Sequence, residues 1–170
     1  TFTQGGFPKL VLESKREFAS NYGLQAEYWR HFKPEESPEV LAYLKSNLRD
    51  LANHYHSQYQ QASLAKDKPA NYAEASRCYR EFLASFPQDP DSPPINYQLA
   101  DLLLEEKNYG EAALEYERTA YDYAAHEKAA AAGYAAVFAH REHLKCAGEA
   151  EQAVVKRATV ASSLRFAGTF

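Results

Sequence analysis

Two histidines and one cysteine have the residue types and the spacing that could bind a metal ion. His140, His143 and Cys146 fall at positions i, i+3 and i+6 of an expected helix, so they share one face. A zinc site needs three or four nitrogen, sulfur or oxygen ligands in a tetrahedral arrangement. All three candidates lie on one helix, and the simpler interpretation is a polar helix end whose dipole favours cations. We therefore predict neither a bound metal nor a cofactor.

The sequence contains none of the common catalytic motifs. There is no G-x-S-x-G, no P-loop and no G-x-G-x-x-G. The adjacent carboxylates of Glu35-Glu36 and Glu105-Glu106 do not face each other on a helix, so neither pair suits acid–base catalysis. The net charge of −4 gives no basic footprint for nucleic acid. No apolar stretch is long enough to span a bilayer. These observations predict a protein that is not an enzyme.

The amino-acid composition indicates helices. The 170 residues include 29 Ala and 16 Leu, which are strong helix formers, but only seven Val and Ile together. So few β-branched residues cannot furnish the inner faces of a sheet. The 22 Tyr and Phe and the single Trp are too many for a disordered chain. We therefore predict an all-α fold.

Capping signals and apolar spacing divide the chain into helices. The first is expected over residues 8–22, with Gly23 ending it in the left-handed conformation. After a short segment at 24–32, Ser37-Pro38 begins a long helix to about residue 65. Trp29 in the short segment is either a core anchor or a partner contact. The remaining helices are expected from about 71, from 92 to 106, from 108, from 127 to 145, and from 149 to the end.

A short pattern occurs twice. N-Y-x-E-A-x-x-x-Y begins at Asn71 and again at Asn108, 37 residues later. Each copy follows a helical segment and a polar break. Small residues let two helices approach closely, and large rings fill the gaps between successive pairs. The pattern therefore indicates a repeated pair of helices.

The repeat resembles the tetratricopeptide repeat (TPR). The best match is Pro93–His126, which spans 34 residues. The family pattern is W-x2-L-G-x2-Y, then A-x3-F, then Pro. Leu99-Ala100 stand at Leu-Gly, and Ala112 and Tyr116 stand at A-x3-F. The chain departs from the pattern at three positions, where Asn96 replaces Trp, Leu103 replaces Tyr and Ala124 replaces Pro.

The resemblance implies an α-solenoid of about three antiparallel helix pairs, preceded by an N-terminal helical segment. That segment covers residues 1–36, and the repeat domain covers 37–170. The three units are expected at about 37–92, 93–126 and 127–170. The last residues echo the end of an earlier repeat, and we expect the chain to be part of a longer protein.

The linkers add a second resemblance. Phe86-Pro87 and Ser92-Pro93 are similar to the joints of bacterial envelope TPR proteins. This implies a periplasmic or outer-membrane-associated protein with a role in envelope biogenesis.

In this family the first helix of each pair lines a concave groove that binds partners. The resemblance therefore implies a protein-interaction scaffold that binds an extended or helical segment of a partner. Apolar contacts would hold the segment, and its Lys or Arg would meet Asp101 and Glu105. The implied groove residues are Arg49, Asn53, His56, Tyr97, Asp101, Leu104, Glu105, Tyr134 and Phe138.

Two alternatives stay open. The chain is a structural spacer if its last helix stacks on further repeats or on a second copy. The sign of this would be an exposed apolar face formed by Val154, Val155, Val160 and Leu164. The other alternative is a sensor of a metal or small molecule through the helix histidines.

Overall fold

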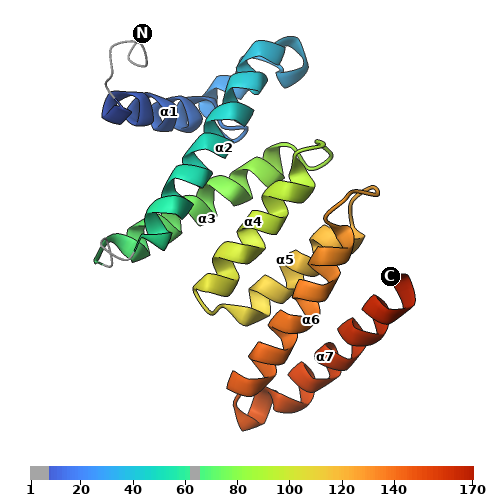
Figure 1. Cartoon of the computed structure of the whole chain (residues 1–170). Coiled ribbons are helices and arrows are strands. Elements are labelled where there is room, and N and C mark those ends of the chain that lie inside the picture. The colour runs from blue at the N-terminus through green and yellow to red at the C-terminus, as the bar shows by residue number, and fades with distance from the viewer. Residues whose placement is uncertain (1–7, 62–65) are drawn as a thin grey trace. The chain divides into compact units, whose positions relative to one another are not determined.

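The structure, a computed structural model, describes residues 8–61 and 66–170. Within these ranges the chain is helical and contains no strand, which confirms the all-α prediction (Figure 1). The chain divides into two compact units, one ending at Pro87 and the other spanning Gln88–Phe170. None of the described helices is long and apolar enough to cross a membrane.

The first unit is built on one long helix. Its elements are α1 (Pro8–Tyr22), η1 (Glu27–Arg30), η2 (Pro34–Glu36), α2 (Pro38–Gln60) and α3 (Lys68–Ser85). Helix α2 packs against α1 and, more extensively, against α3 (Figure 1). The predicted boundary between residues 36 and 37 therefore lies inside a compact unit. The long helix predicted to reach about residue 65 ends earlier, because α2 stops at Gln60 and Gln61 is extended. Residues 62–65 lie outside the described residues, as do residues 1–7.

The core of the first unit follows from helical spacing. Leu44, Leu48 and Leu51 recur every three or four residues along α2 and are completely buried. Tyr79 and Phe82 of α3 are also completely buried. Burying side chains of this size contributes about 1.5–3 kcal/mol each. This packing fixes the α2–α3 pair.

Trp29 and Gly23 lie just after the C-terminal end of α1, and the sequence analysis predicted a role for each of them. The indole N–H of Trp29 donates to the Tyr22 carbonyl, 2.9 Å away, so Trp29 ties η1 to α1, but its side chain is part-exposed and is not a core anchor. The left-handed conformation expected at Gly23 is wrong, because its φ lies outside that region. Gly23 instead permits close approach, since a Cβ there would lie 2.5 Å from Oε1 of Glu81.

The second unit contains four consecutive helices. They are α4 (Ser92–Glu105), α5 (Tyr109–Tyr121), α6 (Ala129–Cys146) and α7 (Glu149–Thr169). Each packs on the next along the chain (Figure 1). Ala100, Ala112 and Ala132 are completely buried, and their small side chains let the helix backbones come close. Of the run of four alanines at 129–132, Ala132 alone is fully buried.

The turn between α4 and α5 ends the first helix in a Schellman motif. The N–H of Asn108 donates to the Leu103 carbonyl at 2.9 Å, and that of Lys107 donates to the Leu104 carbonyl at 3.0 Å. Lys107 has a φ of 65°, a conformation that this motif usually gives to glycine. The motif reverses the chain so that α5 packs back on α4.

A glycine allows α7 to dock on α6. A Cβ added at Gly133 would lie 2.9 Å from Cδ2 of Phe166 and 3.1 Å from Cε2 of Phe170. It would also lie 3.2 Å from the hydroxyl of Tyr121. The aromatic end of α7 therefore occupies space that only glycine leaves open.

Gly133→Ala is predicted to destabilise the protein by about 1–2 kcal/mol, because the new methyl group must displace packed rings. Helix propensity alone predicts a gain of about 1 kcal/mol. The matched control is Gly168→Ala in α7, where a Cβ would meet no atom within 4 Å. Urea unfolding measures both. Stabilisation by both substitutions would contradict the packing described for Gly133.

Candidate functional site

The residues implied for the groove fall into two sets. Arg49, Asn53 and His56 lie on α2 of the first unit. The other six lie in the second unit, with Tyr97, Asp101, Leu104 and Glu105 on α4 and Tyr134 and Phe138 on α6. Each set is therefore described within its own unit.

In the first unit, two of these residues form an internal hydrogen-bond chain. Tyr79 of α3 donates its hydroxyl proton to Oδ1 of Asn53 at 3.3 Å. Nδ1 of His56 lies 3.0 Å from the same hydroxyl, and Nε2 of His56 lies 3.3 Å from the amide nitrogen of Gln60. His56 is buried. Asn53 and His56 thus serve the packing of α3 on α2.

Asp101 in the second unit accepts a hydrogen bond from a buried tyrosine, as Asn53 does in the first unit. The hydroxyl of buried Tyr116 donates to Oδ1 of Asp101, joining α5 to α4. Burial raises the pKa of Tyr116 far above its ordinary value, and the hydrogen bond to Asp101 adds to this. The ring of Tyr97 packs edge-on against Tyr116 with centroids 5.3 Å apart. Lys128 Nζ lies 5.6 Å from the centroid of the Tyr97 ring.

Asn96 is also bonded internally. Its amide donates to Oε2 of Glu115 at 2.6 Å, and its carbonyl oxygen accepts from the hydroxyl of Tyr123 at 2.8 Å. Asn96 is fully buried. This polar bridge joins α4 to α5 and to the segment that follows α5.

The remaining groove residues of the second unit face outward. Tyr134 is 66% exposed and Phe138 47% exposed, although both lie mid-helix. They are four residues apart, so they share one face of α6. Tyr134 also contacts the ring of Phe166, with centroids 6.2 Å apart. On α4, Leu104 is partly exposed and Glu105 is exposed.

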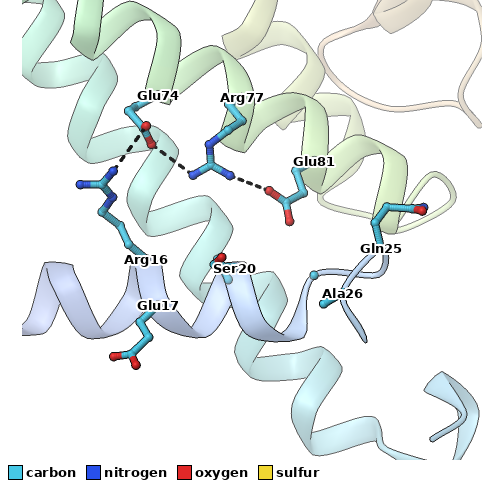
Figure 2. A pocket seen from close by; sticks show the side chains of 10 residues that line it. Arg16, Glu17, Ser20, Gln25, Ala26, Glu74, Arg77 and Glu81 are labelled. Atoms are coloured by element: carbon cyan, nitrogen blue, oxygen red, sulfur yellow. Dashed lines mark hydrogen bonds and ion pairs between the residues drawn. The ribbon is translucent and has the colours of Figure 1, made fainter. Parts of the chain in front are cut away.

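A charged hollow lies in the first unit, and the sequence did not reveal it. It has a volume of about 630 Å³ and is lined by residues of α1, of the segment after it and of α3. Arg77 and Glu81 project from α3 toward α1 (Figure 2). Small residues on α1, including Ala19, leave space between the two helices.

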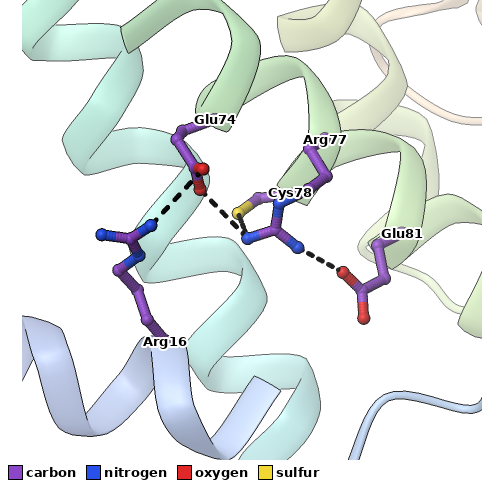
Figure 3. A network of polar contacts seen from close by, with 5 residues as sticks. All are labelled: Arg16, Glu74, Arg77, Cys78 and Glu81. Carbon is purple, nitrogen blue, oxygen red and sulfur yellow. Dashed lines mark hydrogen bonds and ion pairs between the residues drawn. The ribbon is translucent and has the colours of Figure 1, made fainter. Parts of the chain in front are cut away.

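Four of the lining side chains alternate in charge. Arg16 Nη2 lies 3.5 Å from Oε1 of Glu74, and Arg77 bridges Glu74 at 3.1 Å and Glu81 at 2.8 Å (Figure 3). Burial raises the pKa of the Glu81 carboxyl, and the positive charge of Arg77 opposes this. The guanidinium of Arg16 also lies 5.9 Å from the centroid of the Tyr55 ring. The two contacts of Arg16 join α1 to α3 and α2, whereas the bridges of Arg77 lie within α3.

Cys78 lies beside this network, with Sγ 3.5 Å from Nη2 of Arg77 (Figure 3). The thiol is completely buried, and burial raises its pKa to about 11. Thiolates rather than thiols act as nucleophiles. We therefore expect Cys78 to react slowly at neutral pH despite the neighbouring guanidinium.

A hollow of about 500 Å³ in the second unit is lined by the candidate metal ligands of the sequence analysis. His140, His143 and Cys146 come together there, beside Leu114 and Val155. Nε2 of His140 lies 3.1 Å from Oε1 of Glu117, and this hydrogen bond lowers the pKa of the Glu117 carboxyl. In residues 8–61 and 66–170, no group of three or more His, Cys, Asp or Glu is arranged to hold a metal ion.

Part of the charged network could have been recognised from spacing. Glu74, Arg77 and Glu81 fall at i, i+3 and i+7, so they follow one face of a helix. Arg16 lies 58 residues earlier than Glu74, and only the packing of α1 brings it to this face.

Comparisons of the chain with protein-family models, with curated proteins and with solved structures find no match.

The two cysteines are predicted to differ sharply in reactivity, because Cys78 is buried and Cys146 is exposed. A thiol reagent such as Ellman's reagent at pH 8 should label one thiol in the native protein and two in urea. Cys146→Ser should abolish the native reaction, whereas Cys78→Ser should preserve it. Rapid native labelling of Cys78 would contradict the burial of this thiol.

Proposed function

We propose that the chain is a TPR-like protein-interaction module without enzymatic activity. Three antiparallel pairs would form it, namely α2–α3, α4–α5 and α6–α7. The equivalence of the first two pairs supports this. In both, a buried tyrosine of the second helix, Tyr79 or Tyr116, donates to the residue that follows a buried alanine of the first helix.

The observation that carries a binding function is the exposed aromatic pair on α6. Tyr134 and Phe138 leave much of their rings in water, while Ala132, Ala136 and Ala139 on the same helix are completely buried. Exposed aromatic residues are frequent anchors of protein interfaces. The pair would give a partner segment two apolar contacts one helical turn apart.

The second unit also suggests what the partner carries. Leu104 and Glu105 lie on α4, the first helix of its pair, as Tyr134 and Phe138 lie on α6. An apolar segment that also bears Lys or Arg would suit these residues. Asp101 is less available than the sequence suggested, because it accepts the hydroxyl of Tyr116.

The cellular setting follows from the linker resemblance alone. We propose that the module acts in the bacterial envelope, in the periplasm or associated with the outer membrane. Detection of the native protein in a periplasmic or outer-membrane fraction would support this proposal.

The binding function is tested by selecting peptides from a displayed library against the intact chain and measuring their affinities by titration calorimetry. Tyr134→Ser with Phe138→Ser should weaken the selected peptides by about 2 kcal/mol or more, roughly 30-fold, as expected for aromatic anchors. Glu105→Lys should weaken those peptides that carry Lys or Arg.

The matched control is Leu114→Ser, which removes an equally exposed apolar side chain from α5. It should leave affinity within twofold. Asp101 is left unchanged, because its substitution would also break the bond to Tyr116. A selection that enriches no peptide, or peptides that bind the double variant as well as the unaltered chain, would reject the proposed face.

A further inference from the structure

Helix α7 buries one face and exposes large apolar side chains on the opposite face. Val155, Thr159 and Ser162 are buried at successive turns against the rest of the unit. On the other side, Val160 is 52% exposed and Leu164 is 69% exposed. Of the four residues predicted to be exposed, Val154, Val160 and Leu164 are exposed, and Val155 is buried. Val154 borders the histidine hollow.

The outer face forms a regular stripe with a hollow. Six residues at positions i, i+3, i+4, i+7, i+8 and i+11 line a depression of about 460 Å³. This spacing follows one face of a helix over three turns. The stripe consists of Ala153, Lys156, Arg157, Val160, Ala161 and Leu164.

The shape of the stripe suits another helix. The small side chains of Ala153 and Ala161 form depressions beside the larger side chains of Val160 and Leu164. Helices pack by placing the side chains of one between those of the other, and small residues allow close approach. A membrane surface is a poorer match, because interfacial helices usually present a broad face with Trp, Phe and Leu.

The charges of the stripe select among partner helices. Lys156 and Arg157 stand in the middle of it, and the guanidinium Nε of Arg157 donates to the Ala153 carbonyl at 3.2 Å. Among the described residues, no carboxylate forms an ion pair with either cation. Two other cations of this unit have partners, since Lys145 pairs with Glu142 and Arg165 lies over the ring of Tyr121.

These cations also disfavour a second copy of the chain as the occupant. In a two-fold antiparallel packing centred on the stripe, Arg157 of one copy would lie within about one helical turn of Arg157 of the other. Like charges at the centre of an interface oppose association.

We propose that the outer stripe of α7 docks an amphipathic helix of another protein that carries Asp or Glu beside its apolar residues. This interaction is separate from peptide binding at α4 and α6. The apolar side chains of the partner enter the hollow, and its carboxylates meet Lys156 and Arg157.

The test uses a fluorescent, side-chain-stapled helical peptide with a Leu/Ala stripe flanked by Glu. Two control peptides carry Lys in place of Glu, or the same residues with the apolar periodicity scrambled. Fluorescence anisotropy with the intact chain should show saturable binding of the acidic peptide. Its affinity should exceed that of either control peptide by at least about tenfold.

Charge reversal is the decisive variant. Lys156→Glu with Arg157→Glu should weaken the acidic peptide at least about tenfold and improve binding of the Lys peptide. Leu164→Ser should weaken both peptides. Lys9→Glu with Arg30→Glu makes the same change in net charge at exposed sites of the first unit and should have no effect. Circular dichroism checks that each variant is folded.

Three results would overturn the proposal. The first is no saturable binding of the acidic peptide, or binding that the charge reversal leaves unchanged. The second is a concentration-dependent dimer in light scattering that Leu164→Ser dissociates, which would make a second copy the occupant. The third is binding to phosphatidylcholine–phosphatidylglycerol vesicles that the charge reversal abolishes, which would make the stripe a lipid contact.

Discussion

A buried tyrosine hydroxyl bonds the two helices together in both the α2–α3 pair and the α4–α5 pair. Tyr79 is completely buried and Tyr116 is 1% exposed, so each hydroxyl needs a hydrogen-bond acceptor within the protein. Asn53 and Asp101 accept from them on the preceding helix, each directly after a buried alanine, and His56 Nδ1 also lies 3.0 Å from the Tyr79 hydroxyl. A bond to one atom, combined with close contact at the alanine, fixes the rotation of the second helix. That rotation determines which side chains of each pair remain exposed.

The pair formed by α6 and α7 is held differently. It has no tyrosine at the corresponding place, and Thr159 donates to carbonyls of His140 and Val155 instead. The rings of Phe166 and Phe170 pack over Gly133. This arrangement buries one side of α7 and leaves Val160 and Leu164 outside, which gives the last helix a second apolar face. The two surfaces proposed for partners thus follow from how the helices are fixed.

Sequence patterns predicted the elements well because helix ends and apolar spacing are local properties. The first helix was placed at its observed bounds, and the helical composition excluded strands. The role of single residues was harder to predict, because it depends on contacts distant in sequence. The sequence suggested Asn53 and Asp101 as partner contacts, and it gave no sign that they also accept hydrogen bonds from Tyr79 and Tyr116. The charged hollow went unrecognised for the same reason, since it forms only when α1 packs across the pair.

The role of the buried tyrosine hydroxyl is tested most directly by the unfolding free energy of Tyr116→Phe. Urea denaturation measures it beside Tyr109→Phe. The substitution keeps the ring and removes only the hydroxyl that Asp101 accepts. We predict a loss of about 2 kcal/mol for Tyr116→Phe, as for a hydrogen bond to a charged group, and a change below about 0.5 kcal/mol for the part-exposed Tyr109. Equal stability of Tyr116→Phe and the unaltered protein would contradict the claim that this hydroxyl fixes the helix pair.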